Sequence, residues 1–83
     1  MKIDEKFFLE ELKDSSVLIS TKDNYYFILN DVASFIWKKL KEGKEKNEII
    51  ASLCQEFEVE KDLAISDYDK FIERLKNDGI ITL

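Results

Sequence analysis

Hydrophobic and polar positions change their spacing at Asn30. Residues 25–29 (Tyr-Tyr-Phe-Ile-Leu) suit a pleated strand, whereas the apolar residues after Asp31 recur three and four positions apart. This join predicts a strand that leads directly into a helix. Just upstream, residues 16–20 are rich in β-branched side chains, and the polar residues 21–24 favour a turn. The two strand segments are expected to form a β-hairpin.

The first helix is expected to begin at Asp31, with the side chain of Asn30 as its N-cap. Gly43 is expected just beyond its end, because glycine adopts a left-handed backbone at little cost. The apolar stripe of this helix consists of Val32, Phe35, Ile36 and Leu40.

Two further helices follow the same spacing of apolar residues. The second is expected over about residues 46–56 and the third over about residues 62–77. Gly79 is expected to end the third helix, and residues 80–83 to continue as a short extended tail.

An additional strand is predicted near the N-terminus. Residues 7–9, together with Leu12, are apolar among acidic neighbours and favour a short edge strand. A small sheet followed by three helices is an α+β arrangement, and its order resembles a winged helix-turn-helix. Residues 1–83 are expected to form a single domain, because so short a chain has room for one core.

The charge balance and the absence of histidine argue against several classes of function. The chain has 13 Lys and Arg against 18 Asp and Glu, a net charge of −5, which disfavours nucleic acid as the main partner. It has no histidine, the commonest general base and a frequent ligand of transition metals. A hydrolase or a metalloenzyme is therefore not expected, and the sequence predicts neither a cofactor nor a metal site.

The chain has no sequence feature typical of export or membrane insertion. Residues 1–6 lack an apolar signal segment, and no stretch approaches the roughly 20 apolar residues of a membrane span. The single Cys54 has no partner for an intrachain disulfide and no histidine to activate it, so a small buried or half-buried side chain is expected. A cytoplasmic protein without membrane contact is expected.

The aromatic strand at residues 25–29 is the first candidate binding site. Alternate side chains of a strand face opposite sides, so Tyr25, Phe27 and Leu29 are expected to face the core. Tyr26 and Ile28 would then be half-exposed on the other face if the helices cover only one side of the sheet. An open strand of this kind is a template on which an added peptide strand packs.

A DNA-binding winged helix is an alternative hypothesis, in which the third helix would enter a major groove. The outward positions of that helix include Ser66, Asp67, Asp69, Lys70, Glu73 and Arg74. Carboxylates outnumber cations there and would repel phosphate, so DNA binding is the weaker hypothesis. A third hypothesis is a weak homodimer formed through Tyr26 and Ile28.

The join at Asn30 also carries a resemblance to a known family. Residues 29–40 are similar to the Leu-Asn, small-residue, Ile-Trp and Leu pattern of the PqqD-like family. The similarity continues through residues 48–50, Leu53, residues 57–59, Asp67-Tyr68, Phe71-Ile72, Leu75 and Gly79-Ile80-Ile81. Members of this family are recognition elements for the precursors of ribosomally synthesised and post-translationally modified peptides (RiPPs).

The resemblance implies a fold and a binding site. The implied fold is a three-stranded antiparallel β-sheet followed by a three-helix, winged helix-turn-helix-like unit. In the family, a leader peptide adds as a strand to the third strand and lies in the groove between that strand and the third helix. The implied peptide-binding residues are Tyr25, Tyr26, Phe27, Ile28, Leu29, Asp67, Phe71, Arg74 and Leu75.

The resemblance also implies that the protein is a non-catalytic adaptor. Its partners would be a precursor (leader) peptide and a modifying enzyme, either a radical S-adenosylmethionine (SAM) protein or a lasso-type leader peptidase. Two positions depart from the family pattern. Glu45 stands where many relatives have a Thr or Ser cap, so a frayed or shifted start of the second helix is expected. Ile28 stands where relatives are often polar, which would deepen an apolar pocket.

Overall fold

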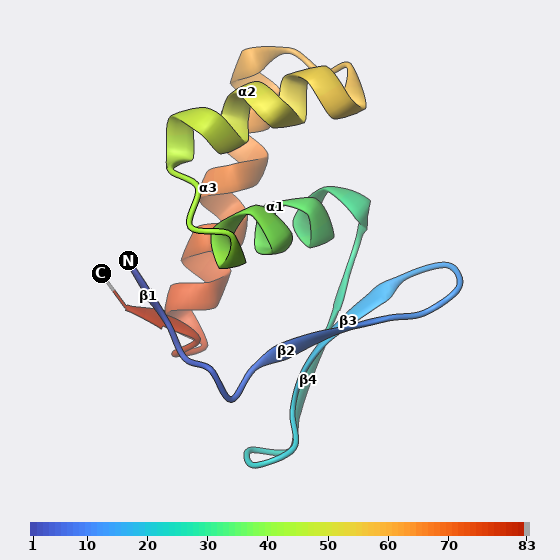
Figure 1. Cartoon of the computed structure of the whole chain (residues 1–83), viewed down its shortest axis with the longest axis vertical. Helices are drawn as coiled ribbons and strands as arrows, with labels where there is room; N and C mark the ends of the chain where they lie inside the picture. Colours follow the sequence, from blue (N-terminus) through green and yellow to red (C-terminus); the bar gives the residue numbers. More distant parts are fainter. Residues whose placement is uncertain (83) are drawn as a thin grey trace.

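The computed structural model describes residues 1–82, and its elements follow the predicted change of spacing at Asn30 (Figure 1). In chain order they are β1 (Lys2–Ile3), β2 (Phe8–Glu11), β3 (Ser16–Ser20), β4 (Tyr25–Leu29), α1 (Asp31–Lys41), α2 (Lys46–Phe57), α3 (Lys61–Asn77) and β5 (Ile81–Thr82). The bounds of the three helices agree with the predicted ones to within about a residue.

The join between β4 and α1 has the predicted cap. The Oδ1 atom of Asn30 accepts a hydrogen bond of 2.8 Å from the backbone N–H of Ala33, which satisfies one of the free donors of the first turn. At the other end, Gly43 adopts the left-handed conformation, with φ of +83°. Strand and helix therefore meet without a linker, as the change of spacing predicts.

The central sheet has three antiparallel strands in the order β2-β3-β4. The register aligns Leu9 with Leu18 and Leu18 with Phe27 on the inner face, which the helices cover. The predicted N-terminal edge strand is confirmed as β2, although it begins at Phe8; Phe7 instead enters the core and is 3 % exposed. The expected α+β fold, a three-stranded antiparallel sheet followed by three helices, is confirmed.

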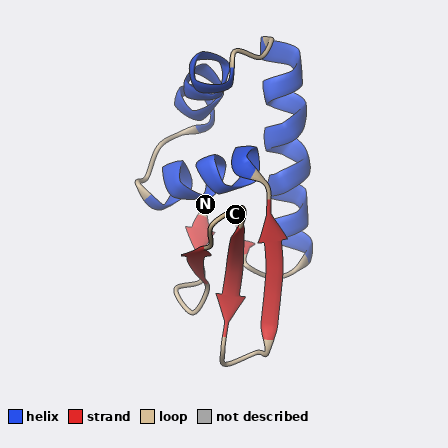
Figure 2. Ribbon diagram, turned by 90° about the vertical axis from the view of Figure 1, so that its right-hand side faces the viewer, coloured by secondary structure: helices blue, strands red, loops and turns tan. Residues whose placement is uncertain are grey.

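The core lies between the inner face of the sheet and the three helices (Figure 2). Each large aliphatic side chain removed from water contributes about 1.5–3 kcal/mol before the entropy of ordering is subtracted. The largest fully buried apolar side chains are Leu18, Leu29, Ile36, Trp37, Ile49, Leu53, Leu75 and Ile80. These residues come from the sheet, from every helix and from the segment after α3, so one core joins all the parts that form the site.

The two ends of the described chain form a second, smaller sheet. β1 pairs antiparallel with β5, with Lys2 opposite Thr82 and Ile3 opposite Ile81. Gly79, with φ of +74°, ends α3 as expected and turns the chain toward this pairing. The sequence predicted an extended tail over residues 80–83 but not its partner, because the two strands lie at opposite ends of the chain; Leu83 lies outside the described residues.

The expectation of a frayed or shifted start for α2 is wrong. The helix begins at Lys46, and Glu48 supplies the missing cap interaction: its Oε1 accepts a hydrogen bond of 3.5 Å from the backbone N–H of Glu45. None of the helices within residues 1–82 has the length and apolar character that crossing a membrane requires.

Candidate functional site: the open edge of β4

β4 is an edge strand with one side unpaired. Within residues 1–82 its only hydrogen-bonded neighbour is β3, so half of its backbone N–H and C=O groups face away from the sheet. The strand consists of Tyr25, Tyr26, Phe27, Ile28 and Leu29, and it carries no charged side chain. Such an edge can accept another strand by backbone hydrogen bonding.

The two faces of β4 differ in burial. On the outer face, Tyr26 is 71 % and Ile28 is 59 % exposed, more than the half-exposure expected from the pattern. On the inner face, Leu29 is buried, as expected for a core residue, whereas Tyr25 and Phe27 are only half-buried. Both rings still pack against the core, as expected, and Phe27 keeps some exposure because it also lines a groove.

This groove lies between β4, the first turns of α1 and the C-terminal half of α3. Figure 2 shows β4 running beside that half of α3. The groove encloses about 320 Å³ and is lined by Phe27, Asn30, Val32, Ala33, Ile36, Asp67, Lys70, Phe71 and Arg74. Its walls are mostly apolar, with charged side chains supplied by α3 only. The groove therefore offers an apolar slot directly beside an unpaired strand edge.

Side chains from α3 tie the start of β4 to the helix. The Tyr25 hydroxyl donates a hydrogen bond of 2.6 Å to Oδ2 of Asp78, and Nε of Arg74 donates to the same oxygen at 2.8 Å. The guanidinium carbon of Arg74 lies 4.1 Å from the centre of the Phe27 ring, a cation-π arrangement. Phe27 and Arg74 both line the groove, so β4 and α3 are in contact at this end of it.

The same network shifts two pKa values in opposite directions. Burial, and then the hydrogen bond to Asp78, raise the pKa of Tyr25 to about 12. The hydrogen bonds donated by Tyr25 and Arg74 lower the pKa of Asp78. At neutral pH the phenol is therefore a neutral donor and the carboxylate a charged acceptor.

The structure brings most of the predicted site residues of α3 to the groove, but not Leu75. Asp67, Phe71 and Arg74 line it, whereas Leu75 is 0 % exposed. Leu75 lies on the helix stripe that also buries Ala64 and Tyr68, so it supports the groove from the core side and has no surface to offer a peptide. Leu75 is therefore a core residue, and we no longer expect it to contact a peptide.

Some residues of the site were not predicted. Lys70 lines the groove one turn before Arg74, and Ile36 contributes to its floor from α1. Asp78 holds Tyr25 and Arg74 together, although only its position four residues after Arg74 signals this role in the sequence. The contact between Tyr25 and Asp78 joins residues far apart in the chain, so no local pattern indicates it.

The outer face of the sheet continues the exposed surface of β4. The register aligns Phe8, Ile19 and Tyr26 in one row across the three strands, and Glu10, Val17 and Ile28 in the next. Phe8 is 45 % exposed, and Val17 and Ile19 are half-buried. We call these six residues the outer sheet face; Glu10 is its single charged member.

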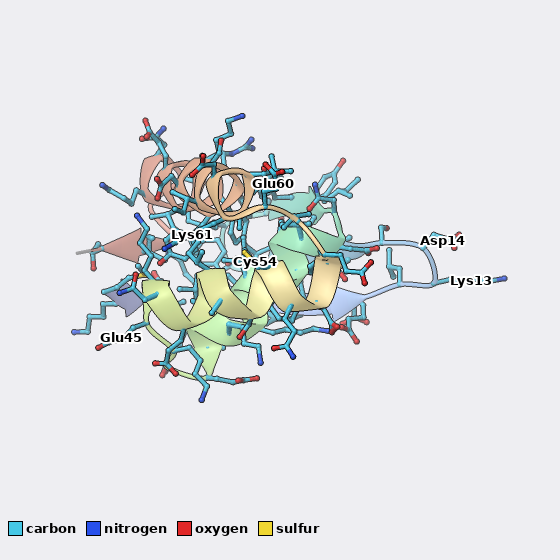
Figure 3. All side chains as sticks on the ribbon, turned by 90° about the horizontal axis from the view of Figure 1, so that it is seen from above. Lys13, Asp14, Glu45, Cys54, Glu60 and Lys61 are labelled. Carbon is cyan, nitrogen blue, oxygen red and sulfur yellow. The ribbon has the colours of Figure 1, made fainter. Side chains whose placement is uncertain are left out.

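A second hollow lies between α2 and α3, away from β4. It encloses about 540 Å³ and is lined by Lys46, Asn47, Ile50, Ala51, Cys54, Lys61 and Ile65. Figure 3 shows Cys54 pointing from α2 toward α3, and Lys13 and Asp14 at the distant tip of the β2–β3 loop. Cys54 is half-buried, as expected, and within residues 1–82 no group of three or more His, Cys, Asp or Glu side chains gathers as for a metal ion.

Comparison with known proteins gives consistent matches. A family model described as coenzyme PQQ synthesis protein D (PqqD) matches residues 15–81. TbiB1 in complex with the TbiA(beta) leader peptide superposes with a TM-score of 0.83, at 32 % identity over 96 % of this chain and 93 % of that chain. Lasso peptide synthetase B1 complexed with the leader peptide shares the fold, with a TM-score of 0.85 at 24 % identity over 99 % and 96 % of the two chains. No curated protein matches the chain in sequence.

Proposed function

The chain belongs to the family of coenzyme PQQ synthesis protein D, and on this premise we propose that it binds the leader segment of a ribosomally synthesised precursor peptide. The observation that carries the proposal is the unpaired edge of β4 beside an apolar groove. The likeness to TbiB1, which was solved with a leader peptide, supports it.

The proposed mechanism is strand addition. A disordered leader becomes ordered as a fourth strand on β4, and its backbone satisfies the free N–H and C=O groups of that edge. Ordering such a segment costs on the order of 2–5 kcal/mol, so apolar side chains must more than offset it. Inward-facing side chains of the leader would pack on Phe27 and Phe71, and outward-facing ones beside Tyr26 and Ile28.

The protein acts as a non-catalytic adaptor in this proposal. The groove is lined by apolar, amide and charged side chains, which suit the recognition of an extended peptide. By holding the leader, the adaptor raises the effective concentration of the attached core peptide at a modifying enzyme. That partner is either a radical SAM protein or a lasso-type leader peptidase.

Titration of the isotope-labelled protein with its cognate leader tests the proposal. The amide signals of β4, of Asn30 and of the groove-facing turns of α3 are expected to shift together as the leader is added. New protection of β4 amides against hydrogen exchange is expected as well, because their free N–H groups become bonded. Shifts scattered over the chain, or confined to α1 and α2 with β4 unchanged, would refute the strand-addition site.

A further inference from the structure

The charges in the groove are not evenly distributed along α3. Asp67 lies at the end near Asn30, whereas Lys70 and Arg74 lie further toward the C-terminus of the helix. The apolar section consists of the half-buried Phe27, Val32 and Ala33, with the largely buried Phe71 beside them, and it borders the two cations. Asp78 pairs with Arg74 and offsets one of these charges, so Lys70 leaves this end of the groove with a net positive charge beside an apolar slot.

Arg74 is held in a defined orientation. Its guanidinium lies over the ring of Phe27 and its Nε donates to Asp78, so one of its five N–H donors is engaged in that bond. The side chain nevertheless remains 51 % exposed. A planar guanidinium that is already ordered loses little entropy when it binds a carboxylate.

Lys70 adds a second cation one turn away, about 6 Å along the helix axis. It lines the groove and takes part in none of the ion pairs formed within residues 1–82. The two side chains can therefore act on one incoming negative charge.

The directions of β4 and α3 determine the order in which a bound strand meets these groups. Tyr25 contacts Asp78 and Phe27 contacts Arg74, so β4 and α3 run in opposite directions. An added strand that is antiparallel to β4, like every pair in this sheet, runs parallel to α3 and passes Phe71 before Arg74. Phe71 and Arg74 are about 4.5 Å apart along the helix axis, and same-face side chains of a strand are about 6.6 Å apart.

We propose that the groove selects an extended peptide with an apolar residue and, two positions toward its C-terminus, an acidic residue. The apolar side chain enters the slot at Phe27 and Phe71, and the carboxylate pairs with Arg74 with Lys70 nearby. This inference rests on the proposed function, and it specifies the chemistry of the leader that the adaptor recognises.

Selection from a display library of random twelve-residue peptides on the full chain tests the inference. Enrichment of sequences with the order apolar, any residue, acidic is expected. A selected peptide should bind the Arg74→Glu variant at least tenfold more weakly than the wild type. Replacing the acidic residue of the peptide by lysine should then raise its affinity for the variant at least threefold. Lys76→Glu makes the same charge change on an exposed position of α3 outside the groove and should alter affinity less than twofold.

Each other outcome overturns the inference. The pairing of an acidic residue with Arg74 would be refuted if the enriched peptides lack the acidic residue or have the reversed order. It would also be refuted if they bind Arg74→Glu with equal affinity. Strand addition itself would not be affected by these results. A library that yields no binding peptide also counts against the inference. The titration with the cognate leader then decides separately whether the proposed function holds.

Discussion

The two edges of the three-stranded sheet differ in how their free backbone is protected. β2, at one edge, carries two carboxylates in four residues, and the carboxylate of Glu11 pairs with Lys38 of α1. β4, at the other edge, is longer, carries no charge and faces the groove. Natural sheets usually block their edges with short strands and charged side chains, because an open edge pairs with other chains.

The difference between the edges indicates which one is available for binding. A strand added to β2 would place its side chains beside Glu10 and Glu11 and would have to desolvate them. A strand added to β4 would meet only aromatic and aliphatic side chains on β4 itself, and the charged side chains beside it would come from α3, the second wall. One sheet therefore combines a protected edge with a receptive one.

The largest expected effect comes from placing a charge on the receptive edge. Ile28→Asp should weaken leader binding at least tenfold, because the carboxylate must be desolvated beside the added strand, while the fold stays intact. Calorimetric titration with the leader measures the affinity, and circular dichroism checks the fold. Phe8→Asp is the matched control, an exposed apolar residue of the outer sheet face on β2, and should change affinity less than twofold. Equal losses for both variants would contradict the distinction between the edges.

The second prediction concerns the contact between β4 and α3. Tyr25→Phe should lower the free energy of unfolding by about 1 kcal/mol near neutral pH, less than the roughly 1.5–3 kcal/mol of a hydrogen bond to a charged group, because Asp78 is partly solvated. Chemical denaturation measures this difference. Tyr26→Phe removes the same atom from the adjacent, exposed ring and should change stability by less than about 0.5 kcal/mol.

The effect of Tyr25→Phe should depend on pH. The pKa of Asp78 is lowered in the folded state, so its contribution is present above the ordinary value of 3.8 and is lost as the pH falls through the lowered value. The pKa of Tyr25 is raised, so its contribution is full below the ordinary value of 10.0 and is lost as the pH rises toward about 12. A difference between the two proteins that is constant from strong acid to strong base would contradict this network.

A smaller effect is expected when the outer sheet face loses its single charge. Glu10→Val completes an apolar surface over all three strands, which favours weak association between copies. Analytical ultracentrifugation at a low and a high protein concentration measures this association. The sedimentation coefficient of the variant should rise at the higher concentration only. Glu10→Gln, which keeps a polar side chain, serves as control and should sediment as the wild type does. A variant that stays identical to the wild type would show that Glu10 does not protect this face.

The smallest effect is expected at the ion pair beside the protected edge. The side chains of Glu11 and Lys38 are both more than half exposed, so Glu11→Gln should change the free energy of unfolding by less than about 0.5 kcal/mol. Thermal or chemical denaturation measures the difference. A much larger loss of stability would contradict this prediction. It would mean that the ion pair holds β2 in position, and that Glu11 does more than place a charge at the edge.

Local signals predicted most of the fold. The turn chemistry of residues 21–24, the cap at Asn30 and the glycines at 43 and 79 all act over a few residues, so they are visible in the sequence and the structure confirms them. β4 was identified for the same reason, as a short run of aromatic and aliphatic residues. The family resemblance added the groove beside the third helix, which periodicity alone does not indicate.

By itself, the sequence determined the order of strand, helix and cap, the small sheet followed by three helices, and the strand on which a peptide is proposed to add. Only the tertiary structure decided that Tyr25 and Asp78 meet, that Arg74 lies over Phe27, that Leu75 belongs to the core and that the chain ends pair. The physical reason is range. Capping, turn formation and periodicity depend on neighbours in sequence, whereas the width and charge of a groove depend on how a helix packs against a strand from a distant part of the chain.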